Sequence, residues 1–175
     1  MKILMVHNCY LLPGGEDEVV RAEKKMLESF GHQVVMYERS NEELKRLSIL
    51  DKLSYSLKDI YWSHQSYSKI RKLIKEHRPQ VSHIHNTFYA ISPSVYQACN
   101  DERVPVVQTL HNYRFLCPIA TFYRDGRVCE DCLTQGRKAA VKNRCWNRSY
   151  ILSAILKNIV DEFYKREIVP TRTKD

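Results

Sequence analysis

Residues 104–117 read Val-Pro-Val-Val-Gln-Thr-Leu-His-Asn-Tyr-Arg-Phe-Leu-Cys. This stretch decides the fold because an apolar run typical of a strand is followed directly by polar side chains. Its first half carries four apolar side chains: Val104, Val106, Val107 and Leu110. Such a run is typical of a parallel strand covered on both faces. His111 and Asn112 follow at its carboxyl end, where open α/β sheets place their ligands. The stretch therefore predicts a buried strand over 104–110 and two candidate site residues.

Length and composition bound the class of protein. The chain has 175 residues, of which 43% are hydrophobic, enough for the core of one domain, or one domain plus an excursion. No apolar run approaches a membrane span, and Met1–Val6 is too short for a secretory signal. We therefore expect a cytoplasmic protein. Peripheral contact with an acidic membrane, at the inner membrane face, is a further expectation. The net charge of +8 favours an anionic partner, or else only a solvated basic surface.

Strand and helix patterns alternate along the chain. Residues 2–7 and 33–37 are typical of buried strands, and a helix is expected between them up to about Phe30, with Gly31 as its stop. Its apolar stripe consists of Val19, Ala22, Met26 and Phe30. A strand–helix–strand unit of this kind is expected to form a right-handed parallel crossover.

The pattern continues through the middle of the chain. A helix is expected over 63–77, a strand over 81–85, and a helix from Ser92-Pro93 to about Asn100. The aromatic segment 55–67 favours helical core, with an aromatic surface for an acceptor or a membrane as the alternative. The predicted class is α/β: a Rossmann-like parallel sheet with helices on both faces.

A histidine–asparagine pair follows three of the predicted strands: His7-Asn8, His85-Asn86 and His111-Asn112. Because the carboxyl ends of parallel strands meet at one edge of the sheet, these pairs are expected to face one crevice. Imidazoles and amides donate and accept hydrogen bonds, which suits a hydroxylated ligand such as a sugar. Taken singly, each histidine is as well explained as a satisfied structural residue.

Two glycines, Gly14 and Gly15, stand before Glu16 at the start of the first helix. Glycine lets a ligand come close to the backbone, and a helix N-terminus favours an anionic group. The spacing is neither a dinucleotide fingerprint nor a P-loop. A tight turn is the alternative explanation for the glycine pair.

Four cysteines form the pattern C-x11-C-x2-C-x12-C: Cys117, Cys129, Cys132 and Cys145. The spacing predicts a structural zinc with four thiolate ligands, and no catalytic metal, since such a site is closed. Reduced thiols without metal are the alternative, and Cys9 and Cys99 are expected to be plain buried thiols. The cysteines lie in a basic lobe, 112–148. From 112 to 150, eight basic and three acidic side chains give a net charge of +5, which keeps a nucleic-acid-binding module open.

These residues together carry a family likeness. The chain resembles the N-terminal half of a family 4 glycosyltransferase of the GT-B fold, over about residues 1–160, in a subgroup with a cysteine-rich insertion. The resemblance lies in these segments: Lys2-Ile-Leu-Met-Val-His7, Pro13-Gly-Gly-Glu16, Val81-Ser-His-Ile-His-Asn86, Val106-Val-Gln-Thr-Leu-His-Asn-Tyr-Arg-Phe-Leu-Cys-Pro118, Arg124-Asp-Gly-Arg-Val-Cys-Glu-Asp-Cys132 and Arg144-Cys145.

The resemblance implies a hexosyltransferase of polysaccharide biosynthesis that retains the anomeric configuration. Its partners would be a nucleotide-sugar donor and a glycan or lipid-linked acceptor, rather than nucleic acid. His111 would contact the transferred sugar near the reacting carbon. Gly14, Gly15 and Glu16 would approach the donor phosphate or the acceptor, and Asn86 and Asn112 the acceptor or the sugar.

The chain also departs from the family, whose members are roughly twice this long. The sequence has no E-x7-E pair of donor-binding glutamates, and a polar tail, 161–175, stands where a further strand is expected. The C-terminal donor-binding domain is thus expected to be absent, and the chain inactive alone. A truncated product, an engineered piece and one half that pairs with a partner chain remain as explanations. A zinc-braced basic nucleic-acid-binding module and an orphaned domain without activity are the alternative functions.

Overall fold

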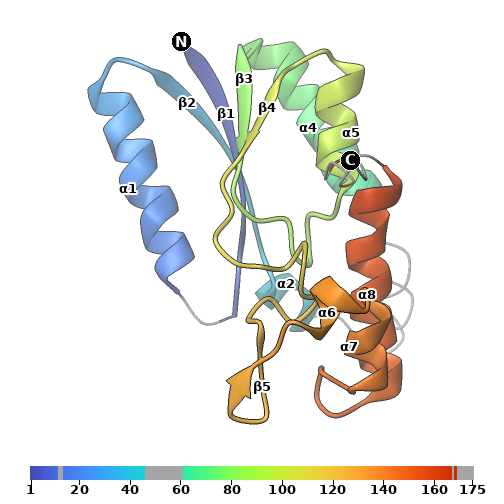
Figure 1. Cartoon of the computed structure of the whole chain (residues 1–175). Coiled ribbons are helices and arrows are strands. Elements are labelled where there is room, and N and C mark those ends of the chain that lie inside the picture. Colours follow the sequence, from blue (N-terminus) through green and yellow to red (C-terminus); the bar gives the residue numbers. More distant parts are fainter. Residues whose placement is uncertain (12–13, 46–60, 167, 169–175) are drawn as a thin grey trace, which may run out of the picture. The chain divides into compact units, whose positions relative to one another are not determined.

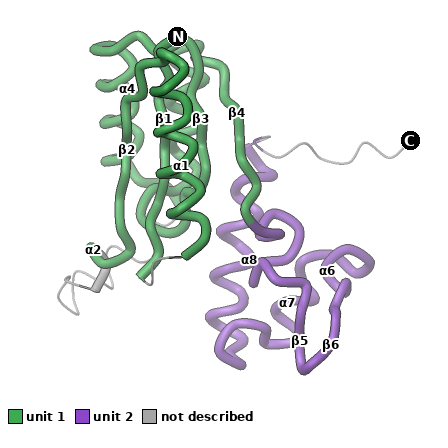
Figure 2. The backbone as a smooth tube through the Cα atoms, turned by 90° about the vertical axis from the view of Figure 1, so that its left-hand side faces the viewer, with its two compact units in different colours: residues 1–111 green, residues 112–175 purple. Residues whose placement is uncertain are grey.

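The computed structural model describes residues 1–11, 14–45, 61–166 and 168. It divides the chain into two compact units, residues 1–111 and 112–175, which Figure 2 colours separately. The predicted basic lobe, 112–148, lies within the second unit. Each unit is described below by itself.

The first unit is built on a parallel sheet of four strands in the order β2-β1-β3-β4 (Figure 1). Its strands are β1 (Lys2–Cys9), β2 (Gln33–Ser40), β3 (Val81–Ile84) and β4 (Val106–Gln108). In the register, His7 pairs with Glu38 and Ile84 with Gln108, so the strands end at a common edge. The predicted α/β class with a Rossmann-like parallel sheet is confirmed.

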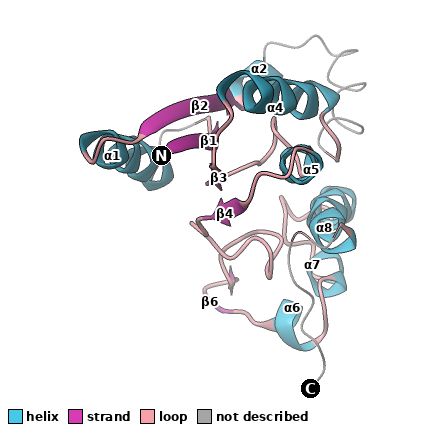
Figure 3. Cartoon of the chain, turned by 90° about the horizontal axis from the view of Figure 1, so that it is seen from above, coloured by secondary structure: helices cyan, strands magenta, loops and turns pink. Residues whose placement is uncertain are grey.

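Four described helices belong to this unit: α1 (Gly15–Ser29), α2 (Glu42–Lys45), α4 (His64–His77) and α5 (Ser94–Asp101). Viewed from above, α1 lies on one face of the sheet, and α4 and α5 lie on the other (Figure 3). Ser63 caps α4 by accepting a hydrogen bond from the Ser66 N–H at 3.2 Å, as expected for a helix over 63–77. Gly31, with φ of 78°, follows α1 in the left-handed conformation that the predicted stop requires.

The apolar core lies between the sheet and the pair α4–α5. Alternate strand residues supply one side of it, among them Leu4, Val6 and Ile84. The helices supply the other side: Ile70, Leu73, Ile74, Val95, Ala98 and Cys99. Each fully buried Leu, Ile or Val contributes about 1.5–3 kcal/mol, so this face stabilises the unit. The opposite face, under α1, instead carries His7, His83 and His85.

The apolar stripe predicted for α1 is wrong. Val19, Ala22, Met26 and Phe30 are exposed, with Phe30 at 76%, while Asp17 and Val20 are buried. Beneath α1 the sheet presents the imidazoles of His7, His83 and His85 beside the apolar Ile3 and Met5. The helix turns two of its carboxylates, Asp17 and Glu23, toward the imidazoles, and Val19 and Met26 point away.

The strand predicted over 104–110 is shorter and more exposed than expected. β4 covers Val106–Gln108 and is an edge strand of the described sheet. Val107 is 52% exposed and Leu110 66%, although Val104 belongs to the core. Successive strand residues point to opposite faces, and Val106 and Val107 are both exposed, so the expectation of a strand covered on both faces is wrong.

The second unit is a small hairpin with three helices. Strands β5 (Tyr123–Arg124) and β6 (Arg127–Val128) pair antiparallel around Gly126, whose φ is 80°. The helices are α6 (Asp131–Thr134), α7 (Lys138–Lys142) and α8 (Tyr150–Lys165). α8 extends into the predicted tail and buries Leu156, Ile159, Val160 and Phe163. Across the described residues no helix, α8 included, has both the length and the apolarity needed to cross a membrane.

Residues 55–60 of the aromatic segment 55–67 lie outside the described residues, and 61–67 lie within them. Tyr67 is described and packs against the core from α4, as the helical-core interpretation expects. Its hydroxyl donates a hydrogen bond to Asp101 at 2.5 Å.

Candidate functional site

The asparagine at the end of β1 holds the sheet edge together. Asn8 is fully buried, and its side-chain oxygen accepts a hydrogen bond from the Ala90 N–H at 3.0 Å. Its amide donates to Asn41 Oδ1 at 3.0 Å and to the Phe88 carbonyl. These bonds tie the segment after β3 to the end of β1. Asn8 therefore has a structural role and holds this part of the fold together.

Two predicted site residues, Asn86 and Glu16, lie together at the same edge. Asn86 Nδ2 donates to the Asn8 carbonyl at 3.0 Å and to Glu16 Oε2 at 3.3 Å. Its Oδ1 accepts from the Phe88 N–H at 3.0 Å. The amide thus positions a carboxylate that stands in the first turn of α1.

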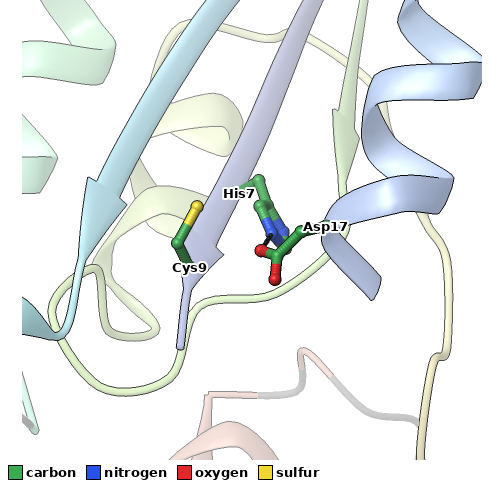
Figure 4. A group of neighbouring side chains, drawn as sticks. All are labelled: His7, Cys9 and Asp17. Atoms are coloured by element: carbon green, nitrogen blue, oxygen red, sulfur yellow. Dashed lines mark hydrogen bonds and ion pairs between the residues drawn. The ribbon is translucent and has the colours of Figure 1, made fainter. Parts of the chain in front are cut away.

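The start of α1 is fixed to the end of β1 by a buried pair. Figure 4 shows His7 and Cys9 on β1 and Asp17 on α1. His7 Nε2 lies 2.9 Å from Asp17 Oδ1. Asp17 Oδ2 also accepts the Gly14 N–H at 2.7 Å. Burial alone would raise the pKa of Asp17, but the hydrogen bonds from Gly14 and His7 outweigh it and lower the pKa. Asp17 is therefore ionised, and His7 donates to it through Nε2.

The glycine pair has open space beside it. Gly14 is extended, with φ of −131°, and a Cβ at Gly14 or Gly15 would meet no described atom within 4 Å. Neither a left-handed turn nor a described neighbour demands glycine here, which leaves room for a ligand. The first turn carries Glu16, Asp17 and Glu18, and these charges favour a hydroxylated group over a phosphate.

A row of imidazoles crosses β3 and reaches His111. The rings of His83 and His85 have centroids 4.2 Å apart, and His85 stacks on His111 at 5.3 Å. Nδ1 of His85 lies 3.0 Å from Nε2 of His111. Burial, reinforced by the neighbouring imidazoles, lowers the pKa of His85 to about 3. His85 is thus a neutral imidazole at physiological pH, and it holds the predicted catalytic histidine by one ring nitrogen.

Sequence reasoning missed three residues of this region: Asp17, Glu23 and His83. Glu23 extends from α1 toward His83 and His85. The alternation His83-Ile84-His85 within a strand was the available signal, because residues two apart share a face. Asp17 carried the weaker signal of an acidic residue in the first turn of a helix.

A pocket of about 350 Å³ opens beside this region, between β1, β2 and α1. Its lining comprises His7, Cys9, Asp17, Val20, Arg21, Lys24, Met36 and Glu38. The Cys9 thiol donates to Glu38 Oε1 at 3.0 Å. Burial and the Glu38 carboxylate raise the pKa of Cys9, so it remains a protonated thiol of low reactivity. Cys9 is only partly buried, whereas Cys99 is buried, as expected.

The four cysteines of the predicted zinc pattern lie in one loop system of the second unit. Cys117 is buried, and its sulfur is hydrogen-bonded to the Cys132 side chain and to backbone N–H groups of Ile119, Thr121 and Phe122. The hydrogen bond to Cys117, burial and the nearby Cys145 and Cys129 side chains raise the pKa of the Cys132 thiol. The hairpin brings Cys129 back, where its N–H donates to the Phe122 carbonyl at 2.8 Å. The loop system thus brings the four cysteines into one region of the second unit.

The described part of the chain contains two groups of three side chains that could bind a metal ion. Within each group, the ligand atoms lie within 4.8 Å of one another. The groups are His7 with Cys9 and Asp17, and Glu23 with His83 and His85. Neither group includes the four cysteines, whose sulfurs would draw closer together to share one ion.

The predicted site residues are thus brought together in part. His111 is joined to His85, Asn86 to Glu16, and Gly14 to Asp17, all within the first unit. Asn112 begins the second unit, where its Oδ1 accepts the Arg114 N–H at 3.1 Å.

Comparison with known proteins identifies the domain. The family model described as Glycosyltransferase Family 4 matches residues 13–163. Comparisons with curated proteins and with solved structures gave no significant match. The match spans most of the chain and includes the glycine pair, the imidazole row and the four cysteines of the pattern. The chain therefore belongs to glycosyltransferase family 4.

Proposed function

We propose that this chain supplies the acceptor-side half of a retaining glycosyltransferase. The complete enzyme would move a hexose from a nucleotide-sugar to a glycan or lipid-linked acceptor. Glycosyl transfer follows from the family. The observation that carries the rest is the pair His85–His111 at the carboxyl edge of the sheet, joined at 3.0 Å.

The charge of this edge suits sugar chemistry. The reacting carbon of a glycosyl group becomes positive in the transition state. Glu16 places a carboxylate at this edge, and the neutral imidazole of His85 adds no charge of its own. The bond to His85 occupies Nε2 of His111, so Nδ1 is the ring nitrogen that would meet the sugar. His111 would then act by contact and orientation.

The glycine pair and its surroundings would receive hydroxyl groups. Gly14 and Gly15 leave space, and Glu16 is held by Asn86 at 3.3 Å as a hydrogen-bond acceptor. Asn112 would add an amide contact. The resemblance assigns donor binding to an E-x7-E pair of glutamates, and these 175 residues include none. We therefore expect the 175-residue chain to bind sugars but to turn over little, because catalysis needs all its groups placed at once.

Histidine-labelled protein tests this proposal. The seven histidines are observed by nitrogen-resolved NMR while nucleotide-sugars and acceptor glycans are added. We expect the His111 signal to move with a saturable sugar, and His111→Ala to weaken binding roughly tenfold or more. His32→Ala, a variant at a histidine far along the chain from the sheet edge, is the control. Saturation without any change at His111 would refute its role, and rapid turnover by the isolated chain would refute the inactivity.

We also propose that Cys117, Cys129, Cys132 and Cys145 bind a structural zinc in the second unit. The fit rests on the backbone N–H groups that point at the Cys117 sulfur and on Arg124, which hydrogen-bonds Cys129. Such donors offset the negative charge of four thiolates. Four protein ligands leave no open position, so the metal would stabilise the loop only. Zinc absent from purified protein, with four freely titrating thiols, would refute this proposal.

A further inference from the structure

We infer that Glu23, His83 and His85 form a second metal site, which binds one zinc-class divalent ion on the α1-covered face of the sheet. Glu23 comes from α1, and the two histidines come from β3 or directly follow it. This inference rests on the geometry of the first unit, apart from both sugar transfer and the cysteine lobe.

The distances between the ligand atoms suit one small ion. Nδ1 of His83 lies 3.4 Å from Glu23 Oε1, and Nε2 of His85 lies 3.6 Å from Glu23 Oε2. All three groups offer a ligand atom within 4.8 Å of the others. Zinc bonds of about 2.0–2.2 Å set ligand atoms roughly 3.3–3.5 Å apart at tetrahedral corners. The three side chains therefore already stand close to the spacing that a shared ion imposes.

Hydrogen bonding does not account for this arrangement. Nε2 of His85 is buried without a hydrogen-bond partner among the described residues, although it points toward a carboxylate. A buried polar nitrogen left unpaired costs about 1–3 kcal/mol, so such atoms are rare in folded proteins. His85 is 3% exposed and His83 9%. An ion between the imidazoles and Glu23 would satisfy Nε2 of His85.

In both histidines, the ring nitrogen that does not face Glu23 already has a hydrogen-bonding partner. Nε2 of His83 lies 2.7 Å from Thr109 Oγ1, and Nδ1 of His85 lies 3.0 Å from Nε2 of His111. Metal-binding histidines characteristically use their second nitrogen in this way, which fixes the tautomer and orients the ring. With the metal bound, His85 donates through Nδ1, and His111 accepts through Nε2 and carries its proton on Nδ1. The site would therefore set the tautomer of His111.

The ligand set determines the class of ion. Two imidazoles and one carboxylate favour zinc and similar transition metals over magnesium and calcium, which prefer oxygen ligands. The Glu23 side chain is 24% exposed, so the ion reaches the site from the α1 side. Three protein ligands leave a fourth position for water.

Cobalt(II) and zinc(II) titrations of the full 175-residue chain test the inference. Thiolate ligands give cobalt an intense near-ultraviolet charge-transfer band, which a site of nitrogen and oxygen ligands lacks, so the two proposed sites are read separately. We expect the wild-type chain to bind one more ion per chain than Glu23→Gln. That additional cobalt ion should not contribute to the thiolate band. Glu18→Gln, an exposed carboxylate on the same helix, should behave as wild type. Equal ion binding by wild type and Glu23→Gln would overturn the site.

A second measurement avoids substitution. Zinc added to histidine-labelled wild-type protein should shift Nδ1 of His83 and Nε2 of His85 and leave His32 unchanged. Shifts at His83 and His85 with a stoichiometry of one support the site, whatever the folding of the variant. Unchanged signals at both histidines under saturating zinc would overturn it.

Discussion

The hydrogen-bonded pair of Asp17 and His7 allows a quantitative prediction of how much Asp17 contributes to the free energy of unfolding. Asp17 accepts two hydrogen bonds, from His7 at 2.9 Å and from the Gly14 N–H at 2.7 Å, and it is 3% exposed. Asp17→Asn keeps the shape but makes the acceptor neutral. The change takes about 1 kcal/mol from each bond, so we expect a loss of about 2 kcal/mol in the free energy of unfolding. In a chain of this size the Tm should fall by roughly 4–8 °C.

The pH dependence identifies the cause. The folded pKa of Asp17 lies below the ordinary 3.8, so its stabilisation is complete above that value and is lost as the pH falls through the folded pKa. The advantage of wild type over Asp17→Asn should thus be full at pH 5–7 and shrink below about pH 4.

Urea denaturation followed by circular dichroism, at several pH values, measures this difference. Glu18→Gln is the matched control, because Glu18 is exposed and its ion pair is with the exposed Arg21. It should cost under about 0.5 kcal/mol. Equal stabilities of the two variants would refute the reasoning, and a gap that stayed constant to pH 3 would assign the loss to packing.

Three further changes test other parts of the structure. Asn8→Ala removes the buried bonds to the Ala90 N–H, the Asn41 side chain and the Phe88 carbonyl, which keeps its bond from the Asn41 amide. The change should cost about 3 kcal/mol in urea denaturation, so an unchanged midpoint would contradict the network. Arg137→Ala removes the bond to Asp161 at 2.7 Å and the stacking over Tyr164, and should cost about 1–2 kcal/mol, against almost nothing for the exposed neighbour in Lys138→Ala. Cys132→Ser should speed amide exchange over 117–145 while the amides of β1 and β3 keep their protection; loss of protection in the sheet would show that the two units depend on each other.

The parts of the fold that could be predicted follow from local periodicity. The strands after Met1 and before Asn86, the helix capped by Ser63 and the stop at Gly31 each depend on a few neighbouring residues. The common edge of the strands then follows from parallel pairing. Sequence could therefore place His85 and His111 in one region before any coordinates were known.

Other features depend on residues far apart in the chain. The rotation of α1 could not be predicted from its own apolar stripe, because it depends on the imidazoles of β3, some 60 positions later. The exposure of Val106 and Val107 on β4 depends on which elements pack over that end of the sheet, and an apolar run alone does not show this. Asn8 and Asn86 look alike in sequence, yet the contact with Glu16 distinguishes Asn86, and only the folded chain shows it.

The chemical contrast between the two faces of the sheet bears on how this domain responds to stabilising substitutions. Valine or isoleucine at positions 83 and 85 would suit a strand under a helix better than imidazole does, and would remove the unpaired nitrogen of His85. Natural proteins forgo such gains where a site needs the less stable residue. The stability recovered by such a valine pair would therefore measure how much folding free energy the domain gives up to keep imidazoles under α1.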